Sequence, residues 1–453
     1  MKTFTALLMA LSMSCLAAVY HLDSAKGNDA NDGLTPETAW QTLQNIATAN
    51  IQPGDSVLFK RGGLWRGHFT LRNGEPGKPV LFSNYGEGPL PIIQDSLAMD
   101  NESDWDMISE EKWSTRNKMF SGYDIDVDVG NIIINHGDVP CPRKRWNMKE
   151  LKEDLEYFYD REAHCVVMRS PVNPALRFDS IELALHHGLV VSHNNAHDAI
   201  VDGLAVRYGA CHGFGGSGAK NITIRNCDIY FIGGGVQQFK DDGTPVRLGN
   251  GVEFWNSADN CLVENNRIWE IYDTGLTAQG RTGELTNLTF RNNLVWNTEY
   301  SFEYWNGETG RTANILFENN TCIDSGRSWG HGHRPDPFGT IVAFYPNLAP
   351  TENFIIRNNI FVNATAWGMR MWNNWMDKLV LSNNLWYTAD RPLYAMSSPQ
   401  ENYYMTHGLQ ETLKKYNNDL DSIFAKPIFV DEANRDYRLA PDSPGYGKNI
   451  GRQ

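Results

Sequence analysis

The chain has 453 residues, of which 41% are hydrophobic and 21% charged, which is typical of a folded protein and argues against disorder. Its formal net charge is −14, so it lacks the overall basic character of proteins that bind duplex DNA or an anionic membrane surface. This balance does not exclude an anionic glycan held by a local basic patch.

Residues 1–18 predict an export signal. Lys2 precedes an apolar run from Leu7 to Leu16, which is too short to span a bilayer, and the small residues Ala17 and Ala18 suit cleavage. Cys15 leaves a lipid anchor open as an alternative to a fully released protein. We therefore expect a periplasmic or extracellular location, with no membrane span, because no other apolar run reaches about 20 residues.

Residues 19–100 are expected to form an N-terminal cap and the first strands of the fold. The segments 54–62 and 80–82 are typical of short buried strands, and a capping helix is expected near residues 40–49. Residues 101–190 interrupt the pattern that follows and predict an inserted small β module.

An internal repeat dominates residues 191–390. Short apolar strands end in Asn-Asn pairs, and the first members of successive pairs, Asn265, Asn292, Asn319, Asn358 and Asn383, are separated by 27, 27, 39 and 25 residues. A constant unit with occasional insertions is typical of a solenoid. The unit is too short for a strand and a packed helix, and it lacks the leucine spacing of a leucine-rich repeat.

The repeat instead predicts coils of three short strands with asparagine in the turns. Stacked asparagine side chains can bond to the coils above and below and satisfy turn backbone that would otherwise be buried without partners. The Asn pairs are therefore interpreted as structural. Residues 391–453 are expected to form a C-terminal excursion and cap.

Three features together resemble a known group: the opening from Asp32 to Trp40, the strand that begins at Pro53-Gly54-Asp55, and the Asn-Asn coils. They are similar to bacterial right-handed parallel β-helix proteins of the pectate-lyase-like superfamily, over nearly all of the chain after residue 18. The resemblance implies an all-β fold and an enzyme that acts on carbohydrate, either a glycoside hydrolase or a polysaccharide lyase. Fold alone does not choose between these activities.

The second strand of each coil carries an unusual set of side chains. Strand alternation directs these residues away from the core and predicts two exposed rows, the first with Glu253, Thr277, Glu303 and Arg370 and the second with Trp255, Gln279, Trp305 and Trp372. Exposed tryptophans next to polar groups are typical of a surface that stacks on sugar rings. The alternative is that the inserted module and the long loops cover these tryptophans as ordinary packing contacts.

Three carboxylates are the candidate catalytic residues: Glu253, Asp273 and Glu303. Two coils separate Glu253 from Glu303, so their Cα atoms are expected to lie about 10 Å apart. Leaning side chains could bring the carboxyl groups within the roughly 6.5–9.5 Å of an inverting glycosidase. Asp273 is expected to project between them, and the sequence does not assign the acid or the base.

Two insertions flank these rows. Residues 233–250 bring Arg247 and Asn250 to one edge, and residues 325–339 bring His331, His333 and Arg334. Long insertions in a regular coil are usually functional or flexible, so we expect these side chains to bind sugar hydroxyls or a uronate. No metal or cofactor is expected, because His331 and His333 in a glycine-rich loop are weak evidence for a metal.

Two other functions stay open. A lyase would use Lys240, Arg247, Arg334 or Arg370 as a base, with Ca²⁺ held near Asp241 and Asp242 as a cofactor. A glycan-binding adhesion protein would need none of the three acids. The expected partner is a polysaccharide or an oligosaccharide in every case, and nothing in the sequence indicates an oligomeric state.

Overall fold

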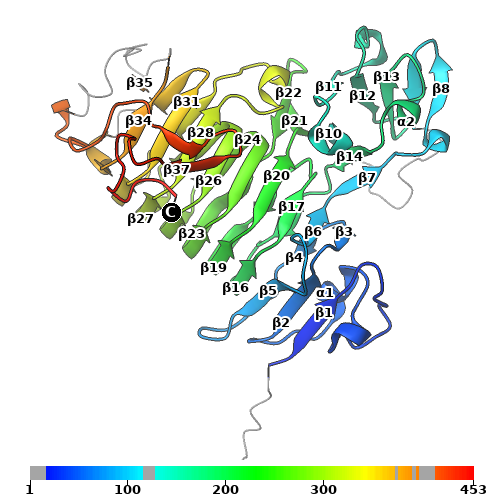
Figure 1. Ribbon diagram of the computed structural model, residues 1–453, viewed down its shortest axis with the longest axis horizontal. Helices are drawn as coiled ribbons and strands as arrows, with labels where there is room; N and C mark the ends of the chain where they lie inside the picture. Colours follow the sequence, from blue (N-terminus) through cyan, green and yellow to red (C-terminus); the bar gives the residue numbers. More distant parts are fainter. Residues whose placement is uncertain (1–16, 116–127, 373–375, 390–393, 397–413, 453) are drawn as a thin grey trace, which may run out of the picture.

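The computed structural model describes residues 17–115, 128–372, 376–389, 394–396 and 414–452, so the predicted export signal and Cys15 lie almost wholly outside the described residues. The fold is a stack of coils with 25 strands in one continuous parallel arrangement (Figure 1). Among the described residues, no helix is long and apolar enough to cross a membrane. Three ladders of parallel strands form the faces of the stack.

The first ladder contains β1 (Val19–Leu22), β2 (Ser56–Lys60), β5 (Val80–Tyr85), β16 (His197–Asp202), β19 (Ser217–Arg225), β23 (Val252–Glu264), β25 (Glu284–Arg291), β27 (Arg311–Glu318), β30 (Thr351–Arg357) and β33 (Leu379–Ser382). The second ladder contains β3 (Leu64–Arg66), β6 (Ile92–Gln94), β17 (Ala205–Arg207), β20 (Asp228–Ile232), β24 (Arg267–Gly280), β26 (Leu294–Asn306), β28 (Thr321–Ser325), β31 (Ile360–Ala364) and β34 (Leu385–Tyr387).

The third ladder carries the candidate site. It contains β4 (Phe69–Thr70), β15 (Val191–Ser192), β18 (Phe214–Gly215), the first half of β23, the second halves of β24 and β26, β29 (Thr340–Phe344), β32 (Trp367–Met371) and β35 (Tyr394–Met396). The strands β23, β24 and β26 each continue through a bend from one ladder into another. Because each of these strands is continuous, the residues before its bend are held in a fixed position relative to the residues after it.

A buried asparagine ladder runs along one corner of the stack, as the repeat predicts. The second asparagine of each pair is fully buried, and its Oδ1 accepts the backbone N–H of the residue one coil above; these residues are Asn266, Asn293, Asn320, Asn359 and Asn384. Each Nδ2 donates to a carbonyl oxygen of the neighbouring strand. The first asparagine of each pair has a positive φ, between 49° and 59°, which asparagine tolerates better than most residues. The pairs therefore turn the chain and satisfy its backbone.

Apolar side chains from all three ladders fill the centre of the stack in one continuous core. At the N-terminal end this core is covered by η1 (Pro36–Thr38) and α1 (Gln44–Thr48), whose Ile46 is buried. At the other end lies η7 (Met376–Lys378), whereas a hairpin of β36 (Phe429–Asp431) and β37 (Asp436–Leu439) packs against the outer side of the second ladder. All six cysteines among the described residues are free thiols.

A β module interrupts the coils between β6 and β15 and stands beside the stack (Figure 1, cyan to green). One sheet contains β7 (Ser96–Ala98), β14 (Ile181–Leu185) and β10 (Val129–Ile134), and the other contains β8 (Asp106–Ser109), β9 (Lys112–Ser114), β13 (Cys165–Arg169), β12 (Glu156–Asp160) and β11 (Arg143–Lys144). Short helices η2 (Glu102–Asp104), η4 (Asn135–Gly137), η5 (Met148–Glu150) and α2 (Pro174–Arg177) connect them. The module has its own apolar core.

The segment 233–250 is a hairpin of β21 (Gly235–Phe239) and β22 (Pro245–Leu248) that joins the module to the coils. Asp128 of the module accepts the backbone N–H of Val236 in the hairpin, at 2.9 Å, and forms a buried ion pair with Lys144, at 2.6 Å. The hairpin is thereby held over the third ladder.

Candidate active site

The register of the third ladder follows the predicted rows. Glu253 pairs with Thr277, Thr277 with Glu303, Glu303 with Ala343 and Ala343 with Arg370. In the neighbouring row Trp255 pairs with Gln279 and Gln279 with Trp305. Strand alternation therefore placed these side chains on the correct face.

The expectation that the first row is exposed is wrong. Glu253 and Glu303 are each only 5% exposed, Thr277 is fully buried, and Arg370 is 8% exposed. The physical reason is the two insertions, which fold over the ladder: Arg334 of the segment 325–339 reaches Asp273, and Phe338 of the same segment lies on the guanidinium of Arg370. The second row is half-buried rather than freely exposed.

A cavity of about 610 Å³ remains between the ladder and the insertions. Seven predicted site residues line it: Arg247, Asn250, Glu253, Trp255, Asp273, Gln279 and Arg334. Its wall also contains His186, Cys211 and His212 from the strand ends near the module. A cavity of this size with polar groups converging on it is typical of a site for a small ligand or for part of a larger one.

Glu253 is held by His212. The backbone N–H of Asn250 donates to Nδ1 of His212 at 2.9 Å, so the ring proton lies on Nε2, which contacts Oε2 of Glu253 at 2.6 Å. Burial raises the pKa of Glu253, but His212 and a hydrogen bond from the Asn250 side chain outweigh it, and the pKa lies below its ordinary value. Glu253 is therefore ionised at neutral pH.

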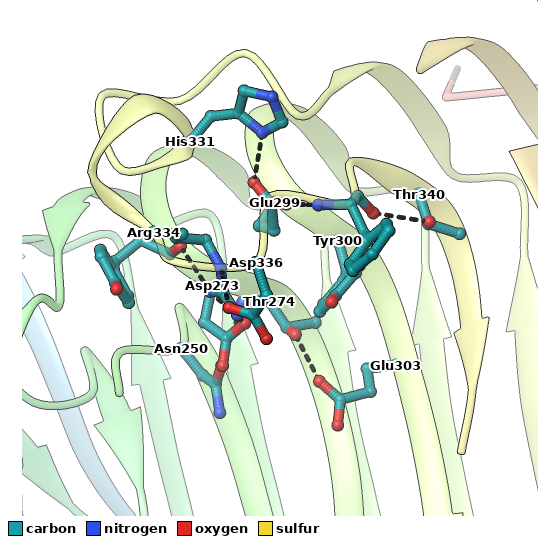
Figure 2. A network of polar contacts seen from close by, with 12 residues as sticks. Asn250, Asp273, Thr274, Glu299, Tyr300, Glu303, His331, Arg334, Asp336 and Thr340 are labelled. Carbon is teal, nitrogen blue, oxygen red and sulfur yellow. Dashed lines mark hydrogen bonds and ion pairs between the residues drawn. The ribbon is translucent and has the colours of Figure 1, made fainter. Parts of the chain in front are cut away.

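Asp273 lies at the bend of β24, where the pairing with β26 shifts register. Arg334 donates to its Oδ1 at 2.9 Å, and the hydroxyl of the next residue, Thr274, donates to Oε2 of Glu303 at 2.6 Å (Figure 2). Asn250 accepts the backbone N–H of Thr274 and so connects this group to Glu253. The three predicted acids thus belong to one polar network.

The pKa values of Asp273 and Glu303 are both raised. Burial is the main cause for each; Arg334 opposes it at Asp273, while the carboxyl group of Glu299 adds to it. Burial and the neighbouring Asp273 raise the pKa of Glu303 to about 8. Two carboxyl groups that interact in this way hold a proton between them at neutral pH, whereas Glu253 does not.

Six predicted site residues do not line the cavity. Trp305 donates from Nε1 to Gln279 at 2.8 Å and packs edge-on against Trp255, so it supports two residues that do. His331 contacts Glu299 at 2.8 Å, and the carbonyl of His333 accepts from Arg247. Arg370 is packed between Trp367 and Trp372. Glu303 lies behind Thr274, buried in the network rather than at the cavity wall.

Arg247 also differs from its predicted role. Its guanidinium donates to the carbonyl oxygens of Gly234 and Gly130, at 2.7 and 2.9 Å, and lies over the ring of Tyr272. These bonds engage the side chain within the protein. Arg247 therefore holds the hairpin against the module and borders the cavity, and it is not a free cation aimed at a uronate.

Sequence reasoning missed His212 and Glu299. His212 belongs to the coil next to that of Glu253, because the backbone N–H of Gly213 donates to the carbonyl of Asn250. The available signal in the sequence was a histidine just before strand β18. Glu299 occupies the position equivalent to Asp273 in the next coil, because Thr274 pairs with Tyr300. It is fully buried and holds the segment 325–339 through His331 and the backbone N–H of Phe338.

A family model described as a right handed beta helix region matches residues 177–333. The chain is a right-handed parallel β-helix. The resemblance, which was drawn from the opening segment and the Asn-Asn coils, is thereby confirmed. The predicted fold class is confirmed as well. A lacto-N-biosidase of Bifidobacterium longum subsp. longum is 31% identical over 81 residues, a match that covers 16% of this chain and only 5% of the relative.

Solved structures with the same fold include a glycoside hydrolase, with a TM-score of 0.55 and 8% identity, over 89% of this β-helix and 99% of that chain. A pectate lyase also matches, with a TM-score of 0.45 and 13% identity, over 95% and 90% of the two chains. At these identities the likeness concerns the fold, and the activity has to be argued from the site.

The raised pKa of Glu303 predicts a pH-dependent gain in stability from Glu303→Gln. A carboxyl group whose pKa rises to about 8 on folding, from about 4.3 in the unfolded chain, contributes stability that is complete below about pH 4 and is lost as the pH rises towards 8. The variant does not suffer this loss. Relative to the unaltered protein, its thermal midpoint should rise between pH 4.5 and pH 8, by the equivalent of a few kcal/mol.

Thermal melts at several pH values check this expectation. Glu284→Gln, an exposed residue on β25, serves as the control and should leave the pH dependence unchanged. A Glu303→Gln curve parallel to that of the unaltered protein across this range would mean that Glu303 is ionised in the folded state.

Proposed function

We propose that this β-helix is a glycoside hydrolase that cleaves a polysaccharide or an oligosaccharide in the cavity beneath the two insertions. The observation that carries the proposal is that the two carboxyl groups at the cavity wall have pKa values shifted in opposite directions, Glu253 downwards and Asp273 upwards. Glycoside hydrolysis requires one carboxylate and one carboxylic acid, and a pair whose environments differ in this way supplies both.

In the proposed reaction Asp273 protonates the glycosidic oxygen as the bond to the anomeric carbon breaks. Glu253 acts on the opposite side as the ionised carboxylate, either by activating a water molecule or by attacking the anomeric carbon. Arg334 and His212 hold the two groups in place through the bonds described above. Glu303 is a positioning residue, which keeps a proton in the network beside Asp273 up to about pH 8.

The rest of the cavity suits a sugar. Trp255 offers an aromatic face, Gln279 and Asn250 offer amide groups, and Trp305 fixes Trp255 and Gln279 from behind. Such a wall can bind a sugar ring, because the face of the ring is apolar and its hydroxyl groups lie around the rim. The glycoside hydrolase with the same fold is consistent with this proposal, and the short match to a lacto-N-biosidase suggests which oligosaccharides to test first. Residues 1–18 further support action outside the cytoplasm.

A lyase is less well supported. Arg247 and Arg334, the cations at the cavity wall, are engaged by backbone carbonyls and by Asp273. Lys240, Asp241 and Asp242 lie in the exposed turn of the hairpin. Ca²⁺ would be required as a cofactor only on this alternative, and the hydrolytic route that we propose needs no metal in the cavity.

The test is incubation of the purified protein with a panel of polysaccharides and with oligosaccharides that contain lacto-N-biose. Hydrolysis produces new reducing ends, whereas a lyase produces an unsaturated uronate with ultraviolet absorbance, and an adhesion protein binds without any product. New reducing ends without that absorbance are expected. Either other result would overturn the proposed activity.

A pH profile tests the role of Glu303. Glu303→Gln removes the buried carboxyl group that keeps its proton up to about pH 8 beside Asp273, so the proton that this pair retains at neutral pH should be lost at a lower pH. The alkaline limb of the kcat/KM profile should therefore move by about one pH unit towards acid, with KM little changed. A purely structural role would lower activity equally at every pH.

A further inference from the structure

Three side chains from distant parts of the sequence meet where the β module leaves the coils and returns to them. His68 lies between β3 and β4, Asp95 lies between β6 and β7, and His187 follows β14. One nitrogen of each imidazole and one carboxylate oxygen all lie within 4.8 Å of one another. None of the three lines the cavity of the candidate active site.

The carboxylate of Asp95 is only partly satisfied. Asp95 is 2% exposed, and its Oδ1 contacts Nδ1 of His187 at 2.8 Å. Its Oδ2 is buried and has no hydrogen-bond partner in the described part of the chain. A buried carboxylate oxygen without a partner costs free energy, so this atom requires an explanation.

A simple His–Asp pair does not account for the cluster. Such a pair occurs elsewhere, where His197 contacts Asp198 at 3.1 Å on the first ladder. At the module junction a second imidazole, that of His68, lies with its ring centre 5.8 Å from that of His187. Two imidazoles and a carboxylate oxygen that lacks a partner form a donor set, whereas the first pair is a single contact.

We propose that His68, Asp95 and His187 bind a divalent transition-metal ion, with Zn²⁺ the best fit. Imidazole nitrogen and carboxylate oxygen are Zn²⁺ ligands, and three protein ligands leave a fourth position for water. His68 is exposed, so the cluster is open to solvent beside His68, whereas Asp95 is buried. Drawing the three donor atoms around one ion requires side-chain movements of about 1 Å, because ligand bonds are about 2 Å long.

The ion would add a further link between three segments that hydrogen bonds already join, since Arg66 donates to Glu182 and to Ser96. The backbone N–H of Leu185 already donates to the carbonyl of Asp95, at 2.9 Å, so the two strands that enter and leave the module run together here. His68 adds the first coils to this junction. Because His186, the neighbour of His187, lines the cavity, the metal would also fix one part of the cavity wall.

Zn²⁺ binding by the chelator-stripped, full-length protein tests the proposal, measured by calorimetry with Zn²⁺ alone and by the visible spectrum of the Co²⁺ form. We expect one ion per chain and a thermal midpoint that rises with Zn²⁺ concentration. Asp95→Asn and His68→Ala should each weaken binding by at least about tenfold. His68 is exposed, so its variant is expected to fold normally, which circular dichroism can verify.

Two control variants separate this site from the other donors. His197→Ala removes the simple His–Asp pair, and Cys211→Ser removes the thiol that lies beside His186 and His212. Both should bind Zn²⁺ like the unaltered protein. The proposal is overturned if the unaltered protein does not bind Zn²⁺, or if binding persists in Asp95→Asn and His68→Ala and disappears in Cys211→Ser.

Discussion

Glu253→Gln and Asp273→Asn are each expected to lower kcat by about 10²–10⁴-fold, with a smaller change in KM. Each substitution keeps the size of the side chain and removes either the ionised carboxylate or the proposed proton donor at the cavity wall. The glutamine can still accept the bond from Nε2 of His212, and the asparagine can still accept from Arg334, so both variants should fold. Steady-state hydrolysis of the best substrate from the panel measures the effect.

Glu284→Gln is the matched control, since it makes the same chemical change on an exposed strand of a different ladder. It should retain full activity. If either cavity variant were also fully active, that residue would not be the acid or the base, and the proposed chemistry would need another pair of groups. Unchanged thermal midpoints would show that any loss of activity arises at the site.

Asn293→Ala is expected to cost about 3–5 kcal/mol of the free energy of unfolding. The Asn293 side chain accepts from the backbone and the side chain of Asn266 and donates to the carbonyl of Val263 and to Asn320, all at 3.0 Å. Alanine leaves the N–H of Asn266 buried without its partner and removes the side-chain bonds to the carbonyl of Val263 and to Asn320. Denaturant unfolding followed by tryptophan fluorescence measures the loss.

Asn314→Gly provides the comparison for this variant. Asn314 has a φ of 56° and is exposed at a different corner of the stack, so glycine can adopt its backbone conformation. A loss below about 1 kcal/mol is expected, because its bond to Asn287 is in contact with solvent. Equal losses in the two variants would mean that the buried ladder has no special role in stability.

Much of the scaffold could be predicted because it depends on local pattern. The constant spacing from Asn265 to Asn319 fixes the length of a coil, and a coil of constant length must stack equivalent residues. Alternation within β23 and β26 then places Glu253 and Glu303 on the same outward face, two pairings apart. No knowledge of distant contacts was required for these predictions.

The burial of that face could not be predicted in the same way. It depends on how the segments 233–250 and 325–339 fold over the ladder, and neither contains a repeat that specifies its conformation. The contact between Arg334 and Asp273 joins residues 61 positions apart, and that between His212 and Glu253 crosses from one coil to the next. The pKa values of the three acids follow from these covering contacts, so the acid and base roles that we propose could not be read from the strands alone.

The asparagine ladder also has a consequence for how such a protein can change. Asn320 and Asn359 are bonded as Asn266 and Asn293 are, although 39 residues separate the first pair and 27 the second. The extra residues leave the stack at another corner, where they form the segment that carries Arg334. Lengthening or exchanging this segment would alter the walls of the cavity and leave the hydrogen bonds of the asparagine ladder unchanged. The specificity of the proposed site can therefore change when this segment is replaced, without a matching loss of folding stability.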